Sequence, residues 1–107
     1  MISKTCSRPV FLSLEEAARF ITNGSLVAIG GRMEMEPMAF VRTLVRHRKK
    51  DLRLVTVPGG GLAVDMLIGA GCVKSVETPQ VGLDEFGQAP HFRQSAQNGE
   101  IKVLDQV

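Results

Sequence analysis

Two clusters of glycine constrain this sequence most strongly, because each stands where an expected strand meets an expected helix. Gly30–Gly31 follows the apolar run Leu26–Ile29, and Gly59–Gly61 follows the run Leu52–Val57. Glycine has no Cβ, so a backbone N–H in such a cluster can approach a ligand closely. The N-terminus of a helix also presents unpaired N–H donors and a partial positive charge. The repeated pattern therefore predicts one edge of an α/β site at the carboxyl ends of parallel strands.

The apolar pattern around the clusters predicts an alternation of helices and strands. The expected helices begin at Leu14, Pro37, Gly61 and Pro90, and the expected strands begin at Leu26, Leu52, Val73 and Ile101. Ser13 and Glu16 form a capping box for the first helix, and Asn23–Gly24 is expected to stop it after Thr22. The stretch 77–89, which contains Pro79, Gly82 and Gly87, reads as a loop or as a strand with breaks. We expect a single α/β domain over 1–107, with an open, mainly parallel sheet and helices on its faces.

Length and composition are those of an ordinary globular domain. The chain has 107 residues, of which 44% are apolar and 22% charged, so it is expected to form one core. Residues 1–9 lack the apolar centre of a secretory signal peptide. No apolar run approaches the ~20 residues needed to span a bilayer. These features favour a cytoplasmic protein that does not enter a membrane.

Charge and cysteine content argue against several functions. The net charge is +2, and much of it comes from the basic run 42–50, which we interpret as a solvated helix end or, alternatively, a patch for the phosphates of a nucleotide-like cofactor. The chain has no Trp or Tyr and no recognition motif to accompany that run, so nucleic acid is not an expected partner. Cys6 and Cys72 show no metal-ligand spacing, so we expect reduced thiols and no metal.

The last expected strand, residues 101–107, is followed by no helix that would cover it. An exposed final strand would leave an unprotected sheet edge. This ending favours either a fragment, incomplete at its C-terminus, or a subunit that a partner completes. A short tail without regular structure is the alternative.

Five blocks of sequence, in order, resemble the A (alpha) subunits of the family I coenzyme A transferases, in their glutaconate CoA-transferase-like branch. The blocks are Asn23–Gly31, Pro37–Arg42, Asp51–Val57, Asp65–Lys74 and, taken together, Ala89–Arg93 with Gly99–Ile101. The resemblance extends from about Ser13 to Leu104. It implies a Rossmann-like architecture, coenzyme A as part of a thioester substrate, and no metal.

The resemblance also implies how the chemistry is divided between subunits. In this family a glutamate carboxylate attacks an acyl-CoA thioester, and CoA then moves to a carboxylic acid. That glutamate is expected on a B-type partner in a hetero-oligomer, so no catalytic residue is expected in this chain. Glu85, in an E-x-G triplet, is the weak alternative. Two other functions stay open: a non-catalytic CoA-binding or assembly module, and a subunit of a CoA-thioester hydrolase.

Main-chain donors near the glycines are the expected binding groups, because each step places negative charge on a carbonyl oxygen. The candidate substrate- or oxyanion-binding residues are Gly30, Gly31, Arg32, Gly59, Gly60 and Gly61. The alternative is that these glycines only permit tight turns. Arg32 stands where the family usually has an aromatic residue; it and Arg93 are possible carboxylate clamps. Glu34 and Glu36 are expected to face solvent, with contact to the site as the alternative.

Overall fold

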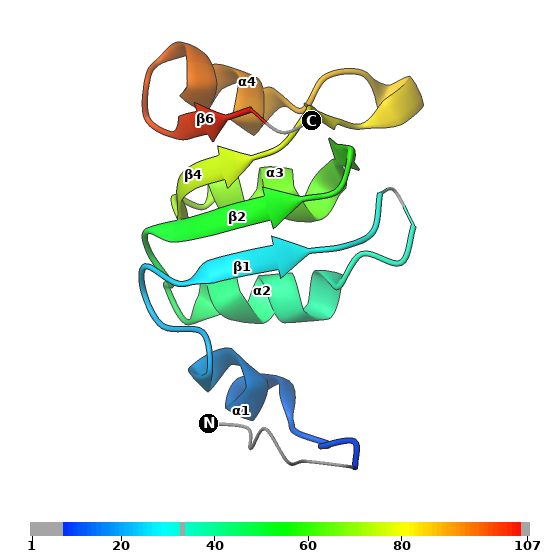
Figure 1. Ribbon diagram of the computed structural model, residues 1–107, viewed down its shortest axis with the longest axis vertical. Coiled ribbons are helices and arrows are strands. Elements are labelled where there is room, and N and C mark those ends of the chain that lie inside the picture. The colour runs from blue at the N-terminus through cyan, green and yellow to red at the C-terminus, as the bar shows by residue number, and fades with distance from the viewer. Residues whose placement is uncertain (1–7, 33, 106–107) are drawn as a thin grey trace.

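A four-stranded parallel sheet forms the centre of the protein (Figure 1). The computed structural model describes residues 8–32 and 34–105. The strands are β1 (Leu26–Ile29), β2 (Leu52–Thr56), β4 (Val73–Glu77) and β6 (Lys102–Leu104), and they lie side by side in that order. The helices are α1 (Leu14–Arg19), α2 (Met38–Arg46), α3 (Gly61–Gly69) and α4 (Pro90–Gln97). The predicted α/β class with a mainly parallel sheet is confirmed.

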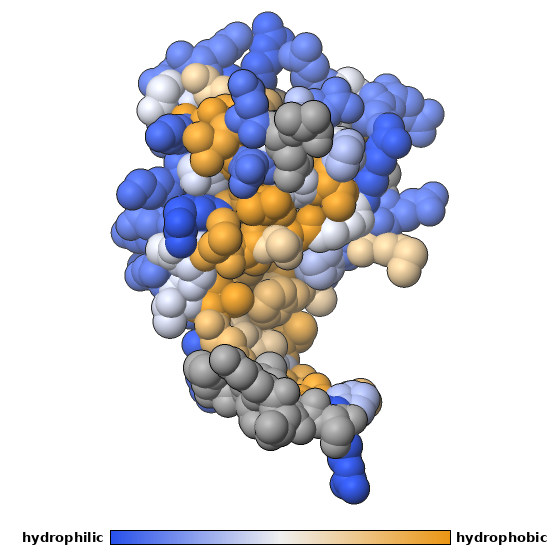
Figure 2. Space-filling model, in the orientation of Figure 1, coloured by the Kyte–Doolittle hydropathy of each residue, from blue (hydrophilic) through white to orange (hydrophobic). Residues whose placement is uncertain are grey.

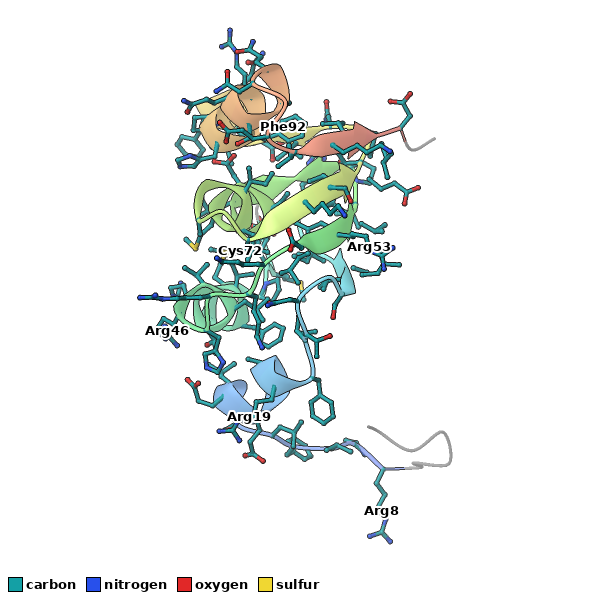
Figure 3. All side chains as sticks on the ribbon, turned by 90° about the vertical axis from the view of Figure 1, so that its left-hand side faces the viewer. Arg8, Arg19, Arg46, Arg53, Cys72 and Phe92 are labelled. Atoms are coloured by element: carbon teal, nitrogen blue, oxygen red, sulfur yellow. The ribbon has the colours of Figure 1, made fainter. Side chains whose placement is uncertain are left out.

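Helices α2, α3 and α4 lie on the same face of the sheet (Figures 1 and 3). Each connects a strand to its immediate neighbour in the sheet, and the strand order never reverses. Parallel crossovers are right-handed, so a sheet built in one direction places all its crossover helices on one side. Within the described residues, the expected crossover helices therefore pack on a single face of the sheet.

The core fills the space between these helices and the sheet. Alternate strand residues such as Leu52, Leu54 and Val76 point into it and are almost fully buried. Val64 and Leu67 of α3 meet them from the helix side and have no exposed surface. This alternation is the period of two that a strand requires when one face is buried.

The opposite face of the sheet is open and largely apolar (Figure 2). Ala28, Val55, Glu77 and Leu104 stand in register across it, and Leu26 pairs with Arg53 on the same face. Leu26 is 61% exposed and Leu104 is 38% exposed. Purely parallel sheets normally have both faces covered. This open apolar face is therefore a surface on which further polypeptide can pack.

The start of α1 is as predicted, but its end is not. Ser13 and Glu16 form both hydrogen bonds of the capping box. The helix ends at Arg19 with Phe20 as its C-cap, rather than continuing to Thr22. Asn23 instead accepts a hydrogen bond from Lys50 N–H through its side chain, and thereby ties this turn to the start of β2. A tertiary contact therefore replaces the helix stop that the sequence suggested.

The stretch 77–89, expected as a loop or a strand with breaks, contains a short strand and a single helical turn. Strand β5 (Val81–Gly82) pairs in parallel with β3 (Gly59–Gly60), and the 3₁₀ turn η1 (Asp84–Phe86) follows. The second glycine cluster thus enters a separate two-stranded sheet beyond the end of β2.

Candidate functional site

The two glycine loops meet at the edge where β1 and β2 end. The loop after β1 folds over the loop after β2, and Arg32 and Glu36 make the contact. The Arg32 side chain lies so close to Gly59 that a Cβ there would stand 3.0 Å from Arg32 Cγ. The Glu36 carboxylate lies against Gly61 in the same way. The sequence predicted both clusters at one edge of the sheet, and the structure brings the loops that carry them into contact through Arg32 and Glu36.

Gly31 is required by the turn itself. Its φ is +87°, and a Cβ on it would stand 2.9 Å from Glu36 Cα and from the Met35 carbonyl oxygen. A side chain could not be placed there without moving backbone. Gly30 differs, because no atom of the described residues lies within 4 Å of the position of its Cβ. Gly30 therefore faces open space.

The N–H groups of this first pair are free to receive a ligand. Within the described part of the chain, neither Gly30 N–H nor Gly31 N–H donates a hydrogen bond. Gly30 also borders a hollow of about 400 Å³ at the ends of β1 and β2. The hollow, called the strand-end hollow below, is lined by Ala28, Ile29, Gly30, Val55, Thr56, Val57 and Pro58. Because Ala28 and Val55 belong to the open face of the sheet, the hollow opens toward that side.

The second cluster is enclosed rather than open. Gly59, Gly60 and Gly61 are all buried. Val81 lies over Gly60, whose φ is +54° and whose N–H donates to the Val57 carbonyl. In their present positions these glycines provide room for neighbouring side chains and an unusual backbone path.

Glu36 is a site residue that sequence reasoning placed wrongly, since it was expected to face solvent. Its carboxylate oxygen Oε1 accepts a 3.1 Å hydrogen bond from the N–H of Ala63 in the first turn of α3. The side chain is half-buried. Its partner lies 27 residues away, so no local pattern reveals the contact. Glu34 is exposed, as expected.

An ion pair with Asp84 holds Arg32 against the segment that follows β5. Its Nη2 lies 2.9 Å from Asp84 Oδ1, and the side chains are 64% and 41% exposed. Asp84 belongs to η1, so this contact ties the first glycine loop to the segment after β5. Arg32 therefore points toward η1 and does not line the strand-end hollow.

A second pocket lies on the other side of Gly59. It has a volume of about 500 Å³. We call it the α4 pocket; it is lined by Gly59, Gln80, Val81, Gly82, Asp84, Gly87, Gln88, Ala89, Phe92, Arg93, Ala96 and Gln97. Arg93 lines this pocket. Arg32 lies beside the same pocket, because its two contacts, Gly59 and Asp84, are lining residues. Neither arginine lines the strand-end hollow. Glu85 is exposed, and its side chain has no hydrogen bond or ion pair among the described residues.

Asp65 is another polar residue that the sequence did not single out for a role. It is 3% exposed in the middle of α3, and its Oδ1 accepts a 2.8 Å hydrogen bond from Phe92 N–H at the start of α4. A charged residue on the buried stripe of a helix was the available signal, because such residues are rarely buried unless paired. Its role is to fix α4, which forms one wall of the α4 pocket.

The thiol of Cys72 is buried, and burial raises its pKa because a thiolate is poorly solvated there. Cys6 lies outside the described residues. In the described ranges, no group of three or more histidine, cysteine, aspartate or glutamate side chains is arranged to hold a metal ion. None of the described helices has the length and apolar character needed to cross a membrane.

Comparison with known proteins gives a consistent result. The family model described as coenzyme A transferase matches residues 11–105. A protein named as the A subunit of 3-oxoadipate CoA-transferase, from Pseudomonas knackmussii (strain DSM 6978 / CCUG 54928 / LMG 23759 / B13), is 35% identical over 95 residues, which are 88% of this chain and 33% of that protein. An uncharacterized protein from Archaeoglobus fulgidus is 33% identical over 99 residues, covering 87% of this chain and 21% of that protein.

A solved structure shares the fold. The crystal structure of a variant of the decarboxylase AibA/AibB superimposes with a TM-score of 0.80 at 28% identity, over 90% of this chain and 38% of that one. The chain therefore spans between about a fifth and about two fifths of the length of these proteins.

Proposed function

This chain belongs to the coenzyme A transferase family, and from that premise we propose that it is an A-type subunit, or the N-terminal part of one, in an enzyme that moves CoA between an acyl-CoA thioester and a carboxylic acid. The observation that carries the proposal is the pair of N–H groups at Gly30 and Gly31, which have no partner among the described residues and lie beside the strand-end hollow. Acyl transfer requires such donors, because each step develops negative charge on a carbonyl oxygen.

The chemistry follows from that position. A carboxylate on a B-type partner attacks the thioester carbonyl, and the electron pair of the C=O moves to oxygen. The N–H groups of Gly30 and Gly31 donate to that oxygen, and the apolar residues of the strand-end hollow receive the acyl chain. One well-placed donor of this kind is worth roughly 3–4 kcal/mol in the transition state.

The open apolar face supports the inference that this chain does not act alone. The strand-end hollow opens on that face, and its described lining comes only from the ends of β1 and β2 and the residues that follow them. The chain also spans 33% of the length of its 3-oxoadipate CoA-transferase relative. We therefore propose that further polypeptide, including a B-type subunit, completes the site, that the assembly is a hetero-oligomer, and that the chain alone has no transferase activity. We place the enzyme in the cytoplasm.

The acceptor is proposed to be a small carboxylic acid. The name of the bacterial relative specifies 3-oxoadipate, which makes that acid the first to test. Arg32, where the family usually has an aromatic residue, supplies a guanidinium beside the α4 pocket, next to Gly59 and Asp84. Arginine pairs well with carboxylates, so exchange of its partner from Asp84 to a substrate carboxylate is chemically suitable.

A second function has its own support, because the structural neighbour is named a decarboxylase. A hydrolase on the same subunit plan and a non-catalytic CoA-binding or assembly module are further alternatives. Product analysis separates them: a transferase makes a new thioester, a hydrolase releases CoA and free acid, and a decarboxylase releases CO₂. Calorimetric titration with CoA and acetyl-CoA, with and without a B-type subunit, tests whether the chain is a non-catalytic CoA-binding module. Formation of a new thioester by the reconstituted pair supports our proposal, and release of CO₂ or of free acid alone refutes it.

A further inference from the structure

Glu36 lies between the two glycine loops, and a glycine on each side gives it room. A Cβ on Gly61 would stand 2.2 Å from Glu36 Oε1, and a Cβ on Gly31 would stand 2.9 Å from Glu36 Cα. No ordinary side chain could occupy either position while Glu36 keeps its place. The two loops are therefore shaped around this one residue.

Helix α3 has no cap of its own. Its N-cap is Gly60, which offers no side chain, and its first turn contains no acidic residue. Ala63 is the third residue of the helix. Its N–H is one of the groups that normally donate a hydrogen bond to a capping side chain. Glu36 Oε1 accepts that hydrogen bond from 27 residues upstream. Its negative charge also lies at the positive end of the helix dipole.

We propose that Glu36 is a positioning residue whose carboxylate occupies the anion position at the start of α3. In that position it fixes the first glycine loop against the second. The negative charge of Glu36 would also repel a substrate oxyanion from the start of α3. The ligand oxygen is therefore expected to bind at the N–H groups of Gly30 and Gly31 instead. Only this last consequence rests on the proposed function.

The amide of Ala63 reports on the role directly. Replacing Glu36 by alanine removes the acceptor and leaves space beside the amide. We expect hydrogen exchange of Ala63 N–H, measured by NMR on the full chain, to accelerate roughly 2- to 30-fold, the range that corresponds to loss of a helix cap. The matched control is Glu34→Ala, which removes an exposed carboxylate from the same loop and leaves that exchange rate unchanged.

Chemical rescue distinguishes an anion site from a merely structural contact. Acetate added to Glu36→Ala enters the vacated space and slows the exchange of Ala63 N–H again, whereas chloride at equal ionic strength does so much less. Glu36→Gln keeps an oxygen acceptor but loses the charge. Its exchange rate therefore lies between those of the parent and the alanine variant, and acetate does not change it because the space is filled.

The proposal is overturned if Glu36→Ala exchanges at the parental rate, or if acetate protects it no better than chloride. If Glu36→Ala fails to fold in either salt, Glu36→Gln decides: an accelerated Ala63 N–H supports the role, and a parental rate rejects it. These measurements use no acyl-CoA and no partner polypeptide. Their outcome is therefore independent of whether the chain takes part in CoA transfer.

Discussion

Asp65 Oδ1 accepts a 2.8 Å hydrogen bond from the N–H of Phe92, so a buried carboxylate in α3 closes the start of α4. Glu36 does the same for α3, from the loop before α2. In both cases the donor is the third residue of the helix, and the acceptor lies 27 residues upstream. Each helix that borders the candidate site is thus positioned by a carboxylate from elsewhere in the fold.

Replacing Asp65 by alanine should lower the stability of the fold substantially. The change leaves the Phe92 N–H without its acceptor and opens a small cavity at a position only 3% exposed. We expect a loss of about 2–3 kcal/mol in the free energy of unfolding, measured by chemical denaturation. Glu85→Ala, at an exposed position without a side-chain partner in the described residues, serves as the control. Equal stability of the two variants would contradict the capping role of Asp65.

Replacement by alanine should affect stability at Gly61 and catalytic activity at Gly30. Gly61 has a φ of +80°, and its Cβ would collide with Glu36, so Gly61→Ala should lose about 2–3 kcal/mol of stability. In Gly30→Ala the new methyl group meets no described atom within 4 Å, so the variant should change stability by less than about 0.5 kcal/mol. Its methyl group nevertheless enters the region where the substrate oxygen is proposed to bind. CoA transfer by the reconstituted enzyme should therefore fall about 10- to 100-fold.

If Gly30→Ala retains the full transfer rate while the protein remains folded, Gly30 is only a turn residue. Thermal unfolding and steady-state kinetics on the same preparations give both answers.

The ion pair between Arg32 and Asp84 should contribute little to stability. Both side chains are substantially exposed, so water and salt screen the interaction. A double-mutant cycle with Arg32→Ala and Asp84→Ala should give a coupling energy of about 0.2–1 kcal/mol that decreases at high salt. A coupling of several kcal/mol would show that Arg32 is locked to Asp84 and is not available to a substrate carboxylate.

The contact between Glu15 of α1 and His47 at the end of α2 makes stability depend on pH. The hydrogen bond from His47 lowers the pKa of Glu15 below its ordinary value of 4.5. A lowered pKa in the folded state means that the contact stabilises the fold above pH 4.5, and that this contribution is lost as the pH falls through the folded-state value. His47→Ala should therefore be less stable than the parent at about pH 6 and equally stable in strong acid.

A titration of the Glu15 carboxyl carbon by NMR checks this directly. In His47→Ala the pKa of Glu15 should rise toward 4.5, whereas His91→Ala, a change on α4, should leave it at the parental value. An unchanged pKa in His47→Ala would show that His47 is not the cause.

Local signals in the sequence were sufficient for the framework of the fold. The capping box at Ser13, the apolar runs at Leu26 and Leu52 and the glycines that follow them depend on neighbouring residues, and each appears where it was expected. The parallel direction of the strands followed from the alternation of strands and helices. The first glycine pair and the edge of the sheet on which it lies could thus be predicted.

Contacts between distant residues could not be predicted in this way. Glu36 reads as a solvent-facing loop residue because its partner Ala63 is not near it in sequence, and Arg32 reaches Asp84 across 52 positions. Asn23 reads as a helix stop, yet its side chain bonds to Lys50. In each case a polar side chain forms a hydrogen bond or an ion pair with a backbone group or a charged side chain elsewhere in the fold. The short-range pattern has no information about such partners.

The most direct test of the account is the steady-state rate of CoA transfer from an acyl-CoA to 3-oxoadipate, measured by the formation of the new thioester. It should be measured for this chain alone, for the B-type polypeptide of a coenzyme A transferase alone, and for the two together with the remaining polypeptide of an A-type subunit. We predict no turnover by either polypeptide alone and new thioester from the mixture. Turnover by this chain alone, or a mixture that forms no thioester, would contradict the claim that it supplies one part of a shared transferase site.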